Sequence, residues 1–488
     1  MSLFVLLFGR YRHEPWADEV QAYLIAHTTS WTRLFEVLQL EGVAPLYHLT
    51  LRGLSAVLPP FWVLPVVSAT GYLSLLLGVR AVAFLVSGRP TASMVLACLF
   101  GLTDTFVQEL GIVARSYGLG LGLALIASAN VFRAATGDAK HLRRASVWVA
   151  LSMLFSVQGG CVSGGAFVAL VLSSRKSLHA RTAFRWALLP LVALAIDGFF
   201  IRPNVNRTSH QTLFHVPEPS DFVSRAADLI ADGIGASGWW PAGWRFDSKA
   251  QLVLPVVVGV LGALSYGAFG LLGSRQRAFR TLAAGFAFGM VATLTIQLFF
   301  NTGFYRHHLF LVQPWLVLGA SALLVPLRAA RGARWLFVGC MLPLGIHELR
   351  VLQSDLGSDL HGAFVETRAL QEKLPHGAHV VVHAQDAVAL GVLLGRDDIV
   401  YRSSKNHGGA YTRFTLVDRH LFDEADVRDL VQIECALAPD RTYLVVDKGM
   451  HFPFRTVASE EVRLERRITA QIQPIEAFRV VCETLQKP

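Results

Sequence analysis

Long apolar runs separated by short basic segments constrain this chain more than any other feature. Hydrophobic residues make up 53% of its 488 positions and charged residues only 16%, whereas a soluble domain usually carries about 25% charge. Apolar runs of roughly 18 residues or more can cross about 30 Å of hydrocarbon as helices. The sequence therefore predicts an all-α polytopic membrane bundle rather than a soluble enzyme.

The apolar runs predict about 11 transmembrane helices. Residues 2–9 are apolar but too few to cross the bilayer, so we expect this first helix to start upstream or to be incomplete. One interrupted hairpin around Gln158 is an alternative to the two short spans at 146–174. The spans that follow residue 60 are expected at 61–86, 91–108, 116–133, 146–157, 160–174, 184–201, 251–272, 281–300, 308–326 and 335–347.

Four basic segments give the expected orientation. Lys and Arg concentrate at 133–144, 175–185, 275–280 and 328–334, all of which fall on one side of the predicted membrane. Short basic loops stay cytoplasmic, so loops 10–60 and 202–250 and the tail from residue 348 should lie outside. These segments also account for the net charge of +9 without a nucleic-acid partner. We expect residues 138, 178, 276 and 331 inside the cell, and residue 215 and the C-terminus outside.

The tail changes character from the membrane region. Apolar stretches at 379–382, 442–446 and 478–481 predict buried strands, and residues 361–374 and 423–437 predict helices. This alternation predicts a soluble α/β domain over 348–488, following a transmembrane domain over 1–347. Cys435 and Cys482 could form a disulfide if the tail lies outside the cytosol.

Two adjacent carboxylates, Asp18 and Glu19, follow the short apolar N-terminus. Acidic pairs are costly near lipid, so a pair at the mouth of a helix bundle is a candidate functional site. The alternative is a solvated helix N-terminus, where the helix dipole favours acidic residues. Surface helices are expected at 19–29 and 31–40, with a further helix at 45–58.

Other polar groups stand at the outer ends of the predicted spans. They are Glu41 with Tyr47 and His48, Gln108 and Glu109 with Arg115 and Tyr117, Arg202, and the run Tyr305, Arg306, His307 and His308. Each group alone could be an interfacial anchor, because Arg, Tyr and His are common at helix ends. All of them fall on the side opposite the basic segments, which favours one shared polar site.

The residue types of that site limit its chemistry. Carboxylates can act as a general base or hold a divalent metal. Arginines and histidines can bind a phosphate. Together they suit displacement of a phosphate leaving group by a hydroxyl, with the cations stabilising the charge that builds on the departing phosphate.

The order of these motifs resembles the glycosyltransferase-C superfamily over roughly residues 10–330. The motifs are Asp-Glu after the first helix, Glu-Gly-x-x-Pro-Leu-Tyr, Ala-Arg-Ser-Tyr and Tyr-Arg-His-His. Members of this superfamily include protein O-mannosyltransferases, the lipid A aminoarabinose transferase and the lipopolysaccharide-core transferases of rhizobia. The resemblance implies transfer of a sugar from a polyprenyl-phosphate carrier on the outer face of the membrane.

By motif position, Asp18 would be the catalytic carboxylate, with Glu19 beside it. The residues implied to bind substrate are Glu41, Tyr47, Arg115, Tyr117, Arg202, Tyr305, Arg306, His307 and His308. Residues 42–45 read Gly-Val-Ala-Pro, where many relatives carry a histidine before the proline. A divalent metal therefore stays an open question, and no other cofactor is expected.

The sequence as a whole predicts an inverting glycosyltransferase of the inner membrane of a bacterium, with its active site and tail extracytoplasmic. The donor would be a polyprenyl-phosphate-linked sugar, and the acceptor an envelope glycan, lipid or protein. A transporter or flippase for lipid-linked glycans is one alternative, although no internal repeat typical of transporters is evident. An envelope-assembly scaffold whose polar face only binds a partner is the other.

Overall fold

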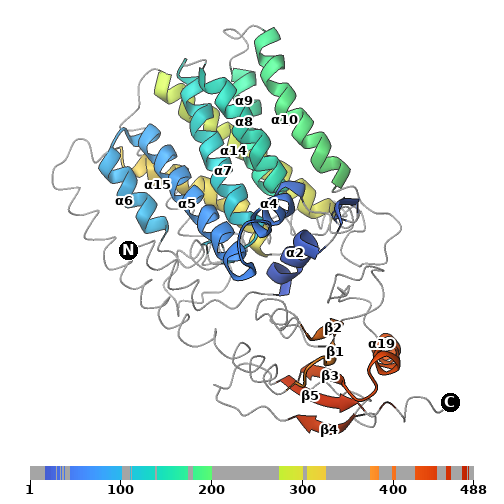
Figure 1. Cartoon of the computed structure of the whole chain (residues 1–488). Helices are drawn as coiled ribbons and strands as arrows, with labels where there is room; N and C mark the ends of the chain where they lie inside the picture. Colours follow the sequence, from blue (N-terminus) through green and yellow to red (C-terminus); the bar gives the residue numbers. More distant parts are fainter. Residues whose placement is uncertain are drawn as a thin grey trace, which may run out of the picture. The chain divides into compact units, whose positions relative to one another are not determined.

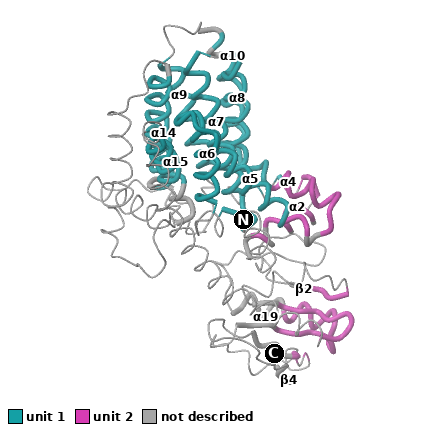
Figure 2. Tube along the Cα trace, turned by 90° about the vertical axis from the view of Figure 1, so that its left-hand side faces the viewer, with its two compact units in different colours: residues 1–9, 35–47, 65–353 teal, residues 10–34, 48–64, 354–488 magenta. Residues whose placement is uncertain are grey.

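The computed structural model divides the chain into two compact units, coloured separately in Figure 2. Unit 1 comprises residues 1–9, 35–47 and 65–353, and unit 2 comprises residues 10–34, 48–64 and 354–488. The structure describes residues 17–28, 30–32, 34–35, 38, 44–101, 110–111, 113–137, 140–173, 180–200, 274–300, 305–325, 374–383, 398–402, 424–447, 458–462, 475–480 and 482.

Unit 1 is a bundle of helices (Figure 1). Its described helices are α5 (Pro60–Ser87), whose first five residues belong to unit 2, α6 (Pro90–Phe100), α7 (Ser116–Ala135), α8 (Lys140–Phe155), α9 (Val157–Ser173), α10 (Ala180–Phe200), α14 (Ser274–Phe300) and α15 (Tyr305–Leu323). Proline opens α5 and α6, where its missing N–H costs nothing. Apolar side chains of these helices, such as Leu125, Val149 and Leu170, form one buried core.

Three of these helices are long and apolar enough to cross a membrane, within the residues that the structure describes. They cover Trp62–Ser87, Ser116–Ala135 and Arg275–Gln297, and α6, α9 and α15 contribute shorter apolar helices. The chain is therefore an integral membrane protein. The predicted spans at 251–272 and 335–347 lie outside the described residues.

The start of α8 differs from the sequence prediction. Residues 140–145 were expected in a basic loop, but α8 begins at Lys140 and places Arg143 and Arg144 in its first two turns. Lys, Arg, Leu and Ala are all good helix formers, so the helix extends past the apolar run. At its other end, α8 stops at Phe155 and α9 begins at Val157. The structure thus has two helices here, separated by one residue.

Glycines let the helices of unit 1 approach at backbone distance. A Cβ built on Gly285 of α14 would lie 2.4 Å from the Cα of Ala166 in α9, and one on Gly289 would lie 2.8 Å from the carbonyl oxygen of Cys161. The pair Gly285 and Gly289 follows the small-xxx-small spacing that brings membrane helices together. Because 285 faces 166 and 289 faces 161, α14 runs antiparallel to α9.

We expect Gly285→Ala to destabilise unit 1. The new methyl group would meet backbone atoms that cannot move aside, and such overpacking typically costs about 1–3 kcal/mol. The midpoint of thermal unfolding in detergent should fall by several degrees. Gly198→Ala in α10 is the matched control, because a Cβ there meets nothing within 4 Å. An equal loss in both variants would contradict the packing argument.

Unit 2 contains α2 (Ala17–Thr28) and most of α4 (Pro45–Ser55), which crosses the boundary between the units at Tyr47. α4 ends at Ser55, three residues before the end of the predicted helix 45–58. Arg52 of α4 donates a hydrogen bond of 3.0 Å to the carbonyl oxygen of Ala26 at the end of α2. Its guanidinium also lies 4.2 Å from the ring centre of Trp31, so Arg52 fastens α4 to the end of α2 and the residues after it.

The tail forms a five-stranded sheet of order β2-β1-β3-β5-β4. Its strands are β1 (His379–His383), β2 (Val400–Arg402), β3 (Thr442–Asp447), β4 (Ala458–Val462) and β5 (Ile475–Val480). β1 is parallel to both β2 and β3, with His379 opposite Val400 and Thr442, whereas β5 is antiparallel to β3 and β4. The helix expected at 361–374 lies almost entirely outside the described residues.

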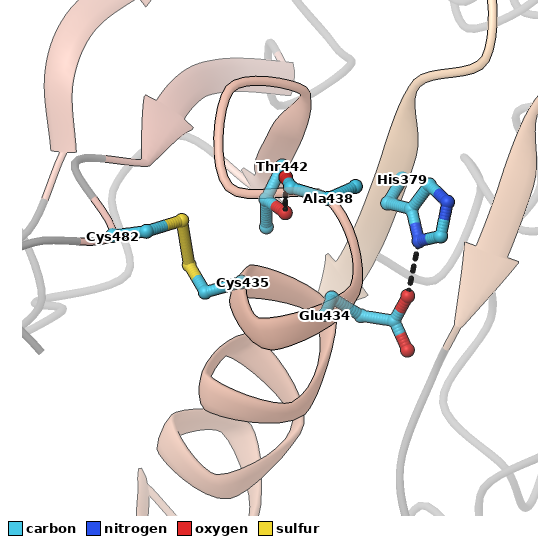
Figure 3. A network of polar contacts seen from close by, with 6 residues as sticks. All are labelled: His379, Glu434, Cys435, Ala438, Thr442 and Cys482. Atoms are coloured by element: carbon cyan, nitrogen blue, oxygen red, sulfur yellow. Dashed lines mark hydrogen bonds and ion pairs between the residues drawn. A yellow bond between two sulfur atoms is a disulfide. The ribbon is translucent and has the colours of Figure 1, made fainter. Parts of the chain in front are cut away.

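One helix of the tail, α19 (Glu424–Leu437), is fixed to the strands at three points (Figure 3). A disulfide joins Cys435 to Cys482, just after β5, with the Cα atoms 5.3 Å apart. The buried carboxylate of Glu434 lies 2.5 Å from Nδ1 of His379 in β1. The hydroxyl of Thr442 donates to the carbonyl oxygen of Ala438 at 2.8 Å. These contacts hold the end of α19 and the residue after it to β1, to β3 and to Cys482 beyond β5.

Candidate functional site

The turn before α7 places a cation at a helix N-terminus. Arg115 is the N-cap residue of α7, and its side chain is half-buried. The guanidinium carbon lies 5.8 Å from the ring centre of Tyr117, within cation–π range. Backbone N–H groups at the start of a helix favour an anion, and the permanent charge of arginine adds to that preference. This turn is therefore suited to a phosphate.

The same tyrosine connects the turn to the start of α15. The ring of Tyr117 meets the ring of Phe310 edge-on, with centroids 6.5 Å apart. Phe310 lies five residues after Tyr305, so the first turn of α15 begins near Arg115. That turn carries Tyr305, Arg306, His307 and His308, whose side chains lie outside the described residues.

The start of α4 meets the turn before α7 as well. The hydroxyl of Tyr47 is buried and donates a hydrogen bond to the carbonyl oxygen of Ala114, the residue before Arg115. Gly118 lies close to the carbonyl oxygen of Leu110. A Cβ at position 118 would lie only 2.1 Å from that oxygen, so a larger residue would clash there. Three segments predicted to share a site therefore meet at one end of unit 1: the start of α4, the start of α7 and the start of α15.

Two predicted site residues, Glu41 and Arg202, lie outside the described residues. So do Gln108 and Glu109. Nothing among the described contacts bears on their roles.

The carboxylate pair lies on α2, in unit 2. The side chain of Glu19 is completely buried. It shares the buried face of the helix with Ala22, Tyr23 and Ala26, which follow at helical spacing. Burial raises the pKa of Tyr23 to about 12, because an apolar surrounding disfavours the charged phenolate. The ring of Tyr23 also stacks on His27, with centroids 5.3 Å apart.

Asp18 belongs to α2, but its side chain lies outside the described residues. Successive positions on an α-helix are separated by about 100°, so positions 18 and 19 cannot point in one direction. Asp18 was expected to be the catalytic carboxylate with Glu19 beside it, and both assignments stay predictions. The side chain of Glu19 is buried on the packed face of α2.

Two buried polar residues near the candidate site were not among the residues predicted from the sequence. Asp197 of α10 and Gln297 of α14 are only 4% and 3% exposed. Oδ1 of Asp197 and both amide atoms of Gln297 make no hydrogen bond to any described residue. A carboxylate inside an apolar run is itself a signal of function in membrane helices, and Asp197 lies within the span expected at 184–201.

Both residues lie toward the end of unit 1 that holds Arg115. Gly159 at the start of α9 approaches the backbone of Gly120 in α7, and the antiparallel α14 therefore ends near the start of α7. The ring of Phe200, at the end of α10, lies 5.9 Å from that of Phe35. Buried polar groups without a hydrogen-bond partner among the described residues are suited to bind the polar groups of a ligand at this end.

No metal-binding group of three His, Cys, Asp or Glu residues occurs in the part of the chain that the structure describes. The side chains of the candidate ligands Asp18 and Glu41 are not among those described. The binding of a divalent metal therefore stays an open question, as it was from the sequence.

No model of a known protein family matches the chain, and no curated protein matches it. Solved structures similar to it include ArnT from Cupriavidus metallidurans bound to undecaprenyl phosphate, at 12% identity and a TM-score of 0.40, over 100% of this chain and 98% of that one. The apo form of the same protein gives 13% identity and a TM-score of 0.43, over 100% and 97%.

Proposed function

We propose that this chain is an integral-membrane glycosyltransferase that moves a sugar from a polyprenyl-phosphate donor to an acceptor of the cell envelope. The observation that carries the proposal is the meeting of three predicted polar segments at one end of unit 1. Tyr47 contacts Ala114, and Arg115 contacts Tyr117, which in turn contacts Phe310. These segments come from distant parts of the chain, and their residues suit a phosphate group.

The proposed reaction is a single displacement. A hydroxyl of the acceptor attacks the anomeric carbon of the sugar, while the bond from that carbon to the phosphate oxygen breaks. Asp18 takes the hydroxyl proton as general base. The polyprenyl phosphate leaves with the electron pair of the broken bond, and Arg115 with Arg306 stabilises the charge on it. The anomeric configuration is inverted, and no covalent enzyme intermediate forms.

The other residues fit around this reaction. Tyr47 and Tyr117 hold the turn that carries Arg115, and His307 and His308 would contact the phosphate or the sugar. Glu41 and Arg202 would complete the site from the outer loops. A divalent cation held by carboxylate oxygens of the site would add positive charge at the phosphate, because such oxygens suit this ion. Glu19 stays a predicted catalytic-site residue beside Asp18.

We also propose that this end of unit 1 and the tail face outward from the inner membrane of a bacterium. Basic residues at the start of α8 and α14 support that orientation, because Lys and Arg near span ends favour the cytoplasm. The disulfide between Cys435 and Cys482 supports an oxidising compartment for the tail. The acceptor would then be a glycan, lipid or protein outside the cytoplasm.

A transfer assay distinguishes this proposal from a flippase. Purified protein in proteoliposomes would receive polyprenyl-phosphate sugars labelled in both the lipid and the sugar, together with an envelope fraction as acceptor. We expect free polyprenyl phosphate to appear at the same rate as the label in the acceptor. Movement of intact donor across the bilayer, with the bond between sugar and phosphate unbroken, would support the transporter instead.

A further inference from the structure

A second cluster of cations lies at the opposite end of unit 1 from Arg115. Lys140, Arg143 and Arg144 occupy the first two turns of α8, which begins where α7 has ended. Their spacing of three and four residues puts them on one face of the helix. The neighbouring His141 is buried instead and lies 2.9 Å from the side-chain oxygen of Asn130 in α7. α8 therefore packs one side against α7 and turns its three cations away from it.

These cations line a pocket together with an aromatic side chain of α10. The pocket has a volume of about 640 Å³ and is lined by Lys140, Arg143, Arg144 and Trp186. The hydroxyl of Ser146 donates to the carbonyl oxygen of Trp186 at 2.5 Å, which fixes α10 against α8 at this level. Among the described residues, the pocket is therefore lined from two helices, α8 and α10.

Two guanidinium groups lie near the indole ring of Trp186. Arg143 lies 5.9 Å from its ring centre and Arg185 lies 5.4 Å from it. Like charges on one ring repel each other, and cations at the start of a helix oppose its dipole. The cation–π contacts favour each guanidinium separately, but the repulsion between the like charges and the unfavourable helix dipole remain. Both are offset when an anion lies among the charges, since arginine binds phosphate oxygens through two parallel hydrogen bonds.

The surface beside the pocket is apolar and exposed. From Trp186 onward, α10 exposes large side chains that include Leu188, Leu191, Val192, Leu194 and Phe199, between 47% and 60% exposed. A soluble anion would use only the charged pocket. A phospholipid would use both parts, with its phosphate among the cations and its acyl chains along α10. Basic pockets between membrane helices are known to bind anionic headgroups.

We propose that Lys140, Arg143, Arg144 and Arg185 with Trp186 form a binding site for the phosphate headgroup of an anionic membrane phospholipid. The site is separate from the proposed transfer site and does not depend on it. It would hold α8 and α10 together at the membrane surface, so the bound lipid should also stabilise unit 1.

Native mass spectrometry of the purified full-length protein can test this site. The protein would be exchanged into detergent with either phosphatidylglycerol or phosphatidylcholine. We expect phosphatidylglycerol to bind at least tenfold more tightly and to raise the midpoint of thermal unfolding. Arg143→Gln/Arg144→Gln should weaken its binding by about tenfold or more, because two charge-assisted hydrogen bonds are lost.

Arg275→Gln/Arg277→Gln is the matched control. Both arginines are exposed in the first turn of α14, another basic helix start, but they do not line the pocket. We expect this control to bind phosphatidylglycerol like the wild type. Equal losses in both double variants would mean a diffuse basic surface and would overturn the proposal. So would equal binding of the two lipids, or displacement of phosphatidylglycerol by millimolar inorganic phosphate.

Discussion

An Asp18→Asn variant is expected to lose sugar transfer by roughly 10²–10⁴-fold, the usual contribution of a general base. The amide cannot accept the hydroxyl proton, although it has almost the same shape as the carboxylate. The midpoint of thermal unfolding should stay within about a degree of the wild type, since an isosteric change at a helix start has little effect on folding. Both quantities can be measured on one purified sample.

Glu19→Gln provides the comparison for that variant. Its carboxylate is completely buried on the packed face of α2. Replacing one carboxyl oxygen of a buried, partnered group by an amide NH₂ leaves a hydrogen bond unmade, which typically costs about 1–3 kcal/mol. Glu19→Gln should therefore lower the unfolding midpoint, while the transfer rate of the folded fraction changes less than for Asp18→Asn. Near-normal turnover in Asp18→Asn would eliminate it as the base, and a large loss confined to Glu19→Gln would assign the base to Glu19.

Loss of the Arg115 side chain is expected to weaken donor binding by more than tenfold. Arg115 caps α7, lies against Tyr117 and cannot lose its charge at physiological pH. A charge-assisted hydrogen bond to phosphate contributes about 1.5–3 kcal/mol. Arg115→Lys should restore only part of the affinity, because a single ammonium group cannot make the bidentate contact. Titration of polyprenyl phosphate into each variant measures the effect.

Arg89→Ala is a closely matched control for Arg115→Ala in this titration. Arg89 is the N-cap residue of α6, as Arg115 is of α7. α5 and α7 run in parallel, with Gly71 beside Leu119 and Gly78 beside Leu125. α6 starts where α5 ends, so Arg89 lies at the opposite end of the bundle from Arg115. Arg89→Ala should bind polyprenyl phosphate like the wild type. Equal affinities for Arg115→Ala and the wild type would leave Arg115 as an anchor at the membrane surface.

Much of the fold was predictable from local pattern. The apolar runs located α5, α7, α9, α10, α14 and α15 because a membrane helix must be apolar along its length. The strands β1, β3 and β5 were also found, because each contains a continuous apolar stretch. The strands β2 and β4, at the two edges of the sheet, were missed. β2 has only three residues, and β4 reads Ala-Ser-Glu-Glu-Val, with the charged residues that are common on edge strands.

The site was less predictable, for a physical reason. A motif gives the residue types and their order, but the distance between motifs depends on how helices pack. The contact of Tyr117 with Phe310 joins residues almost two hundred positions apart, and no local pattern encodes it. The burial of Glu19, beside a carboxylate of the same charge, also depends on packing. Asp197 could have been found, since its carboxylate interrupts an apolar run.

The central claim is that the end of unit 1 holding Arg115 binds a polyprenyl-phosphate donor. The most direct measurement is the identification, by mass spectrometry, of the lipid that stays bound when the protein is purified in mild detergent. We predict a polyprenyl phosphate or its sugar-linked form on the wild type and on Arg89→Ala, and its loss from Arg115→Ala. A preparation in which no such lipid is bound and none binds when added, or one in which Arg115→Ala retains it fully, would contradict the account.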